Sequence, residues 1–440
     1  MIRKFWQKVG ILVLLLSLSL GVVACSSDYL RYAFGRPDRK THITFWQGIN
    51  PPTNREVLQK LVDKFNRSQN DIFVESIYAG QSDQQIPKIL SAVVGNAAPD
   101  LLWYTSTLTG RLVELDALRP LDDLLAKSPL RDRIDPALLP TMQWRGGTHP
   151  IRNRIWSVPF ATNNIGIFYR PSLFKAAGIE KLPQTWAELR QVAQKLTIDK
   201  DGDGRIDQRG IFLPLGKGEF TVFIWTPFLW SAGGELIKDN RPQLATPEAQ
   251  AALQLWQDLI KNDSAVLSQP ERGYEEDNFV SGKVAMQISG SWALRFMTQK
   301  KIDFDVMPIP QDRYPATTIG GENLFLFKST PAREAAAWKF AEFAIGEEFQ
   351  TEWAKQTGYL PINLDSQRSS TYAAYITQQP AVEVFLKQMR SAKSRPLSPD
   401  YPRISESVGR AIEATLLQKR TPAEALADAQ HNLDLALGNS

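Results

Sequence analysis

The sequence predicts an α/β protein in which helices flank mostly parallel sheets. From Thr41 onward, apolar runs of strand composition alternate with stretches whose apolar residues recur at three-to-four spacing. The chain has 440 residues, of which 43% are hydrophobic, which is enough for buried cores in two or three domains. No internal repeat or low-complexity tract occurs, which argues against solenoids and propellers.

The local patterns place the elements in order. Residues 43–46 predict a strand, 54–66 a helix with one apolar face, and 72–78 a second strand. Further on, 186–197 predict a helix and 284–288 a strand. Four helix starts are predicted from a threonine in the N-cap position. Each threonine is followed directly by a proline, or by a glutamate three residues later that completes a capping box. These starts are Thr185, Thr246, Thr330 and Thr421.

The charge balance argues against a nucleic-acid partner. Lys and Arg total 51 against 47 for Asp and Glu, and three of the cations, Arg3, Lys4 and Lys8, lie at the start of the chain. The rest of the chain is close to neutral and has no cluster of Lys and Arg residues that could neutralise nucleic-acid phosphates. Aromatic residues are abundant, with 12 Trp, 11 Tyr and 21 Phe. They offer flat apolar faces for a ligand.

The first residues predict an export signal. The basic start leads into an apolar run over residues 9–23, which is shorter than the roughly 20 residues that span a bilayer. The run ends at Cys25, the only cysteine, in a pattern that resembles the bacterial lipoprotein box. We expect a signal peptide over 1–24, a lipidated Cys25 with a polar tether over 25–40, and attachment to a bilayer facing the periplasm or cell exterior. The alternative is a buried cysteine at the end of a membrane anchor.

Signatures of catalysis are sparse. His42, His149 and His431 are far apart and form no H-E-x-x-H pair, which leaves a zinc hydrolase without a ligand set. Ser291 lacks the flanking glycine pattern of a nucleophile elbow, and no phosphate-binding glycine loop occurs. A secreted glycoside hydrolase with a carboxylate pair stays open as the alternative function.

Eight segments in a fixed order resemble the extracellular solute-binding proteins of carbohydrate ABC importers, the family of the maltose-binding protein. They are APDL at 98–101, WSVP at 156–159, FYRPSLFKAAG at 168–178, LPQTWAEL at 182–189, AGG at 232–234, GKVAM at 282–286, GSW at 290–292 and GYLP at 358–361. Two positions depart from the family pattern. Arg170 stands where the family usually has Asn, and Ser405 stands near a stacking Trp of the maltose-binding protein, which Tyr401 could replace.

The resemblance implies two α/β lobes joined by a hinge of two or three crossings, which close on a ligand. It places lobe one at 41–150 and 316–368, and lobe two at 151–315 and 369–440. It also implies a non-catalytic, monomeric receptor that needs no cofactor. This receptor would capture a sugar or glycoside and deliver it to the membrane subunits of an ABC permease.

A sugar presents an apolar face and a rim of hydroxyls, so its site needs aromatic planes and polar side chains on loops at strand ends. The aromatic candidates Trp292, Trp225 and Trp230 have a core position as their alternative, and Asp83 a role as helix cap. Tyr359 has a surface turn as its alternative. The full set of candidates is Trp292, Trp230, Trp225, Asp83, Gln47, Asn50, Tyr104, Asn163, Glu322, Tyr359 and Tyr401.

One acidic loop has the spacing of a calcium site. Oxygen ligands would come from Asp199, Asp201, Asp203 and Asp207, with the backbone carbonyl of Arg205. Gly204 stands at the turn position, but Gly210 stands where a bidentate Glu is expected. The loop is therefore either a weak structural Ca²⁺ site or a solvated acidic turn.

Overall fold

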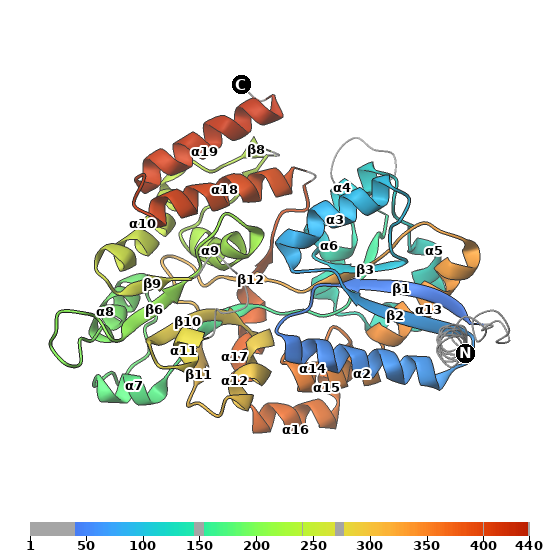
Figure 1. Ribbon diagram of the computed structural model, residues 1–440, viewed down its shortest axis with the longest axis horizontal. Helices are drawn as coiled ribbons and strands as arrows, with labels where there is room; N and C mark the ends of the chain where they lie inside the picture. The colour runs from blue at the N-terminus through green and yellow to red at the C-terminus, as the bar shows by residue number, and fades with distance from the viewer. Residues whose placement is uncertain (1–39, 145–153, 240, 269–276, 399, 439–440) are drawn as a thin grey trace, which may run out of the picture.

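The computed structural model describes residues 40–144, 154–239, 241–268, 277–398 and 400–438. The predicted signal peptide, Cys25, most of the tether and His149 lie outside these ranges. Figure 1 shows two bodies side by side, each a sheet flanked by helices. Within the described ranges, every helix is too short or too polar to cross a membrane.

The first lobe is built on a five-stranded sheet in the order β2-β1-β3-β13-β4. The strands are β1 (Thr41–Gln47), β2 (Ile72–Tyr78), β3 (Leu101–Tyr104), β4 (Ser157–Pro159) and β13 (Asn323–Leu326). β1 runs parallel to β2 and β3, whereas β13 runs antiparallel to β3 and β4.

The second lobe is built on a sheet in the order β11-β5-β10-β6-β9. The strands are β5 (Ile165–Tyr169), β6 (Arg209–Leu213), β9 (Ala265–Leu267), β10 (Val284–Gly290) and β11 (Asp305–Met307). β6 pairs in parallel with β9 and β10, and β5 pairs antiparallel with β10 and β11. Each sheet therefore has four strands in one direction and one reversed strand, which confirms the prediction of mostly parallel sheets. The reversed strands are β13 in the first sheet and β5 in the second, and each antiparallel pairing in the two sheets involves one of them.

The local predictions for the first elements are confirmed. The first two strands are β1 and β2, and between them lies α2 (Pro52–Ser68), which buries the predicted apolar face. Side chains of Thr246, Thr330 and Thr421 cap α10 (Pro247–Lys261), α13 (Pro331–Ile345) and α19 (Pro422–Leu437). Thr185 forms a capping box with Glu188 at the start of α8 (Trp186–Lys195).

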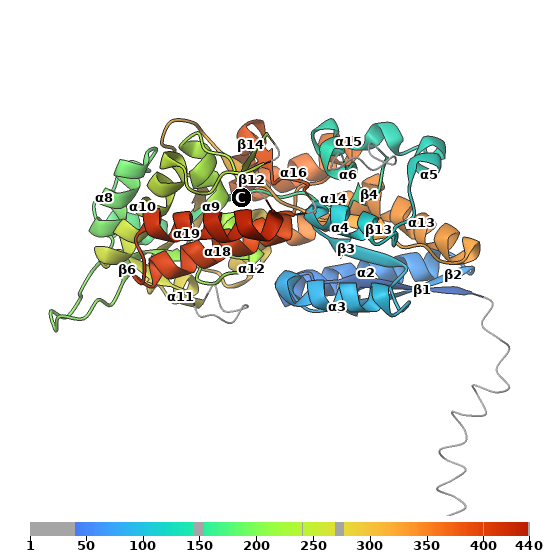
Figure 2. The same cartoon turned by 90° about the horizontal axis from the view of Figure 1, so that it is seen from above.

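The remaining helices pack around the two sheets, some against the strands and others against neighbouring helices (Figures 1 and 2). They are α3 (Ser82–Val94), α4 (Thr109–Glu114), α5 (Asp122–Lys127), α6 (Leu139–Met142), α7 (Pro171–Ala176), α9 (Glu219–Ser231), α11 (Asp277–Val280), α12 (Leu294–Gln299), α14 (Glu347–Thr357), α15 (Leu364–Arg368), α16 (Ser370–Gln378), α17 (Ala381–Gln388) and α18 (Tyr401–Leu416). Two short strand pairs complete the fold. β7 (Ile237–Lys238) pairs with β8 (Arg241–Pro242), and β12 (Thr317–Ile319) pairs in parallel with β14 (Ala392–Ser394).

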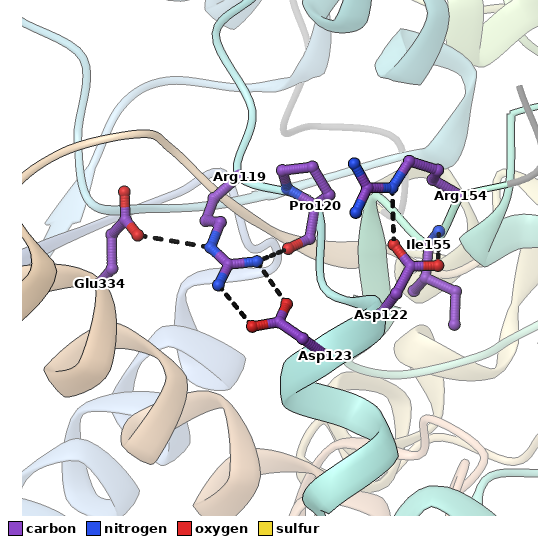
Figure 3. Close-up of polar contacts among 7 residues, drawn as sticks. All are labelled: Arg119, Pro120, Asp122, Asp123, Arg154, Ile155 and Glu334. Atoms are coloured by element: carbon purple, nitrogen blue, oxygen red, sulfur yellow. Dashed lines mark hydrogen bonds and ion pairs between the residues drawn. The ribbon is translucent and has the colours of Figure 1, made fainter. Parts of the chain in front are cut away.

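The lobe boundary near residue 150 is displaced from its predicted place. Figure 3 shows a polar network in which Asp122 accepts hydrogen bonds from the Arg154 side chain and the Ile155 backbone, both at 3.2 Å. With β4 in the first sheet, residues 154–159 therefore belong to the first lobe rather than the second. The reason is that the chain pairs with the first sheet before it crosses to β5. The other boundaries stay predictions.

The same network secures the start of α5. Arg119 donates to both carboxylate oxygens of Asp123, at 2.5 and 2.8 Å, and its Nε lies 3.4 Å from Glu334 of α13 (Figure 3). The hydrogen bonds from Arg119 lower the pKa of Asp123 to about 2. The network thus joins segments that are far apart in the sequence.

Candidate functional site

A cavity of about 510 Å³ lies between the two lobes. Its volume is within the usual range for small-molecule sites. The described lining residues come from loops after strands of both sheets, from α3 and α9, and from the crossing segments. They are Gly48, Asn50, Gln81, Gln84, Trp103, Thr105, Asn163, Glu219, Phe220, Phe223, Trp292, Gly320, Gly321, Glu322, Tyr359 and Arg395. The predicted residues Asn50, Asn163, Glu322, Trp292 and Tyr359 are thereby brought together.

Trp292 follows β10 and lies on one wall of this cavity. Its ring is 6.1 Å from that of Phe223 and packs against apolar side chains of both lobes. Gly290 permits this position, because a Cβ there would lie 1.8 Å from the indole ring. The Trp292 carbonyl accepts a 3.3 Å hydrogen bond from Asn54 of α2, which links the lobes. The partly buried ring therefore has both a packed side and a side that lines the cavity.

The cavity carries buried polar atoms without partners among the described residues. These atoms are Gln81 Oε1, Trp103 Nε1, Asn163 Oδ1, Glu322 Oε2 and Arg395 Nε. The Asn163 backbone is held by reciprocal hydrogen bonds with Gly320, at 2.8 and 3.3 Å. Buried polar groups are normally paired. The cavity therefore offers buried polar atoms that the protein itself leaves unpaired.

Arg395 and Glu219 form an ion pair on the wall of this cavity. Arg395 is only 7% exposed, and its guanidinium lies 4.7 Å from the centre of the Phe223 ring. Glu219 also accepts hydrogen bonds from Tyr401, at 3.0 Å, and from Ser405. Neither member of this ion pair was predicted from the sequence, because no local motif marks them. The contact depends on long-range packing of α9, β14 and α18.

Glu322 is the most perturbed carboxyl group in the cavity. Burial raises its pKa from 4.5 to about 8, against the opposing charge of Arg395. At neutral pH this carboxyl group is therefore mostly protonated and can donate a hydrogen bond.

Glu322 should make the stability of the ligand-free protein fall as pH rises. The folded state keeps a proton that the unfolded chain loses above pH 4.5, so this contribution is full below pH 4.5 and is lost as pH rises through about 8. Urea unfolding from pH 5 to 9 should show this decline in the parent protein and a flatter profile in Glu322→Gln. Equal slopes for the two proteins would contradict the assignment.

Tyr359 is buried rather than placed on a surface turn. It is 4% exposed, and its ring lies 5.5 Å from that of Trp353. Burial, together with the nearby Glu322 carboxyl group, raises the pKa of Tyr359 well above 10.0. The hydroxyl group therefore stays protonated at the edge of the cavity.

Several predicted ligand contacts lie outside this cavity. Trp225 is 1% exposed in the core of the second lobe, and Trp230 is buried with Lys393 above its ring at 5.9 Å. Gln47 is buried, and its Oε1 accepts a hydrogen bond from the Ile49 backbone at 3.0 Å. These three residues do not line the cavity because their side chains are used inside the lobes.

Tyr104, Tyr401 and Asp83 have other positions. The two tyrosines line a second, adjoining cavity. Asp83 lies in the first turn of α3, whose N-cap is Gln81, and its side chain is outside the described part of the structure.

The two departures from the family pattern have local explanations. Arg170 pairs with Asp303 at 2.6 Å in the second lobe. Ser405 donates to Glu219 and therefore helps to hold the Arg395–Glu219 pair. Neither position offers a free side chain to the first cavity.

The acidic loop lies at the outer end of the second lobe, between α8 and β6 (Figure 1). Carboxylate oxygens of Asp199, Asp201 and Asp207 lie within 4.8 Å of one another. Asp203 instead accepts a hydrogen bond from the Arg205 backbone at 2.8 Å. The Gly204 backbone donates to Asp199 and lowers the pKa of that carboxyl group.

The chain belongs to the bacterial extracellular solute-binding protein family, whose model matches residues 60–381. This match confirms the resemblance inferred from the motif order. The sn-glycerol-3-phosphate-binding periplasmic protein UgpB of Yersinia pestis is 24% identical over 413 residues, covering 90% of this chain and 92% of that protein.

Solved structures confirm the two-lobed α/β fold. An ABC transporter solute-binding protein from Thermotoga lettingae, bound with α-D-tagatose, is 25% identical with a TM-score of 0.79, covering 90% of this chain and 99% of that one. UgpB from Mycobacterium tuberculosis, in complex with glycerophosphocholine, is 20% identical with a TM-score of 0.80, covering 91% and 99%. The second likeness concerns the fold alone.

Proposed function

We propose that this chain is the substrate-binding receptor of an ABC importer and captures a sugar or glycoside in the cavity between its lobes. The observation that carries the proposal is the combination of an aromatic wall, Trp292, with the unpartnered polar atoms of Asn163 and Glu322. An aromatic plane suits the apolar face of a pyranose, and the polar atoms suit its hydroxyl rim. Closure of the lobes would present the loaded receptor, as a monomer, to the membrane permease.

The receptor would act without chemical turnover. A glycosidase needs two available carboxyl groups, and the first cavity does contain Glu219 and Glu322. Glu219, however, uses one oxygen for Arg395 and Tyr401 and the other for Ser405. Glu219 is thus committed to a structural ion pair rather than presented to the cavity as a nucleophile or base. This supports binding over the glycoside hydrolase alternative, and no cofactor is required.

The ligand would be neutral rather than phosphorylated. Among the described residues that line the first cavity, the buried cation Arg395 favours a phosphate, as in the ligand for which the UgpB relatives are named. Its charge is already balanced by Glu219. A phosphate would need more uncompensated positive charge.

A thermal-shift panel tests this proposal. Tagatose, maltose and simple glycosides are compared with glycerol 3-phosphate and glycerophosphocholine, and each is assayed for product. A bound sugar at 100 times its Kd should stabilise the fold by about 2.7 kcal/mol. Stabilisation by the phosphates alone would contradict a neutral ligand, and product formation would contradict the receptor.

We expect Cys25 to carry the lipid anchor. Cys25→Ser should abolish lipid attachment and cleavage at this position, because the residue supplies the thiol and the new amino terminus. Metabolic labelling with a radioactive fatty acid and membrane fractionation measure the two effects. Normal lipid labelling of the Cys25→Ser protein would contradict the anchor.

We also expect the acidic loop to bind Ca²⁺ weakly. Millimolar Ca²⁺ should raise the melting temperature of the parent protein. The double variant Asp201→Asn with Asp207→Asn should remove this rise, because both residues belong to the cluster of three carboxylates in the loop. Mg²⁺ at the same concentration is the control. No Ca²⁺ effect on the parent protein would identify the loop as a solvated turn.

A further inference from the structure

A second cavity of about 650 Å³ adjoins the first. Glu219 and Phe220 line both cavities, so the two spaces share a wall. The apolar residues of the second cavity come from both lobes. They are Ile86, Pro87, Leu108, Pro214, Leu215, Phe220 and Pro402.

Buried polar side chains of the second cavity are bonded to the protein, whereas Lys217, Glu406 and Glu413 line it with exposed or half-buried charged groups. Ser268 Oγ accepts a 2.8 Å hydrogen bond from the Leu215 backbone and donates to the Leu215 carbonyl at 3.4 Å. Tyr401 and Ser405 donate to Glu219. Among the described residues that line this cavity, no buried side-chain nitrogen or oxygen is without a partner. The first cavity differs, since Asn163 Oδ1 and Glu322 Oε2 there have none.

We propose that the second cavity binds the apolar, preferably aromatic, aglycone of a glycoside. The sugar of the same glycoside would occupy the first cavity. A second sugar would lose water from its hydroxyl groups and find no unpaired polar atom among the buried residues described in this lining. An apolar group gains free energy from burial against Leu215 and Ile86, and it needs no hydrogen-bond partner there. The solute is therefore an amphipathic glycoside, an inference that rests on the proposed function.

Pairs of glycosides test the assignment. Methyl and phenyl glycosides of glucose, galactose and mannose are compared by titration calorimetry, with maltose as the two-sugar probe. The phenyl member of the preferred pair should bind at least about tenfold more tightly than the methyl member, from the apolar area it buries. Leu215→Gln and Ile86→Gln should remove most of this gain. Leu435→Gln is the matched control, because that leucine is 57% exposed and lines neither cavity.

A second probe does not depend on the sugar. The neutral fluorophore N-phenyl-1-naphthylamine should bind the parent protein with increased emission, and Leu215→Gln should weaken its binding about tenfold. Absence of this binding overturns the inference. Equal affinity for methyl and phenyl glycosides, or tighter binding of maltose than of the phenyl glycoside, also overturns it and leaves the proposed function standing. Fluorophore binding without binding of any sugar supports the apolar cavity and contradicts the proposed function.

Discussion

Replacing Arg395 by Met is expected to lower the free energy of unfolding by about 3–5 kcal/mol. Arg395 is 7% exposed and pairs with Glu219, which also binds Tyr401 and Ser405. Without the guanidinium, the Glu219 carboxylate remains in the protein without its counter-charge. Urea unfolding of the ligand-free protein at pH 7 measures the loss.

Two further variants show whether the loss comes from the unpaired charge. Lys387→Met removes the exposed pair with Glu383 and should change stability by at most about 0.5 kcal/mol. The double variant Arg395→Met with Glu219→Gln should recover part of the stability, because it removes both charges. A loss below about 1 kcal/mol in Arg395→Met, or no recovery in the double variant, would contradict the role given to this pair.

The second large effect is expected at Trp292. Trp292→Ala should weaken binding of the preferred sugar by about 1–3 kcal/mol, because the ligand loses contact with a large aromatic face. Stability should change less than affinity, since the ring is only partly buried. Titration calorimetry measures the affinity, and sugar should change the intrinsic fluorescence of the parent protein.

Trp256 provides the comparison for Trp292. It is fully buried in the second lobe, so Trp256→Phe should lower stability and leave affinity unchanged. If Trp292→Ala behaved in the same way, its ring would be a core residue only and the aromatic wall of the proposed site would be lost.

The features that could be predicted from the sequence are those that depend on residues close together in the chain. Strand and helix periods identified β1, α2 and β2, and threonine caps located the starts of α8, α10, α13 and α19. Loops after strands also led to Asn50 and Trp292 in the cavity. Such features depend on neighbouring residues along the chain, and one sequence contains that information.

Other parts of the site depend on distant segments. Every residue from Thr221 to Ser231 of α9 is buried, so this helix has no polar face to show which of its aromatic residues lines the cavity. The sequence therefore predicts Trp225 and Trp230 as the aromatic ligand contacts of this helix. In the structure, Phe223 lines the cavity instead. Arg395 reaches Glu219 because β14 pairs with β12, a contact between short strands that no local pattern predicts.

β13 lies between β3 and β4 in the first sheet, although Phe325 is roughly 220 positions after its partner Leu102. While the chain is being synthesised, the sheet lacks this strand until about three quarters of the protein has left the ribosome. Pairing between such distant segments slows folding. Late completion of the sheet suits a chain with a predicted export signal, because a polypeptide that has not yet folded can still be threaded through a secretion channel.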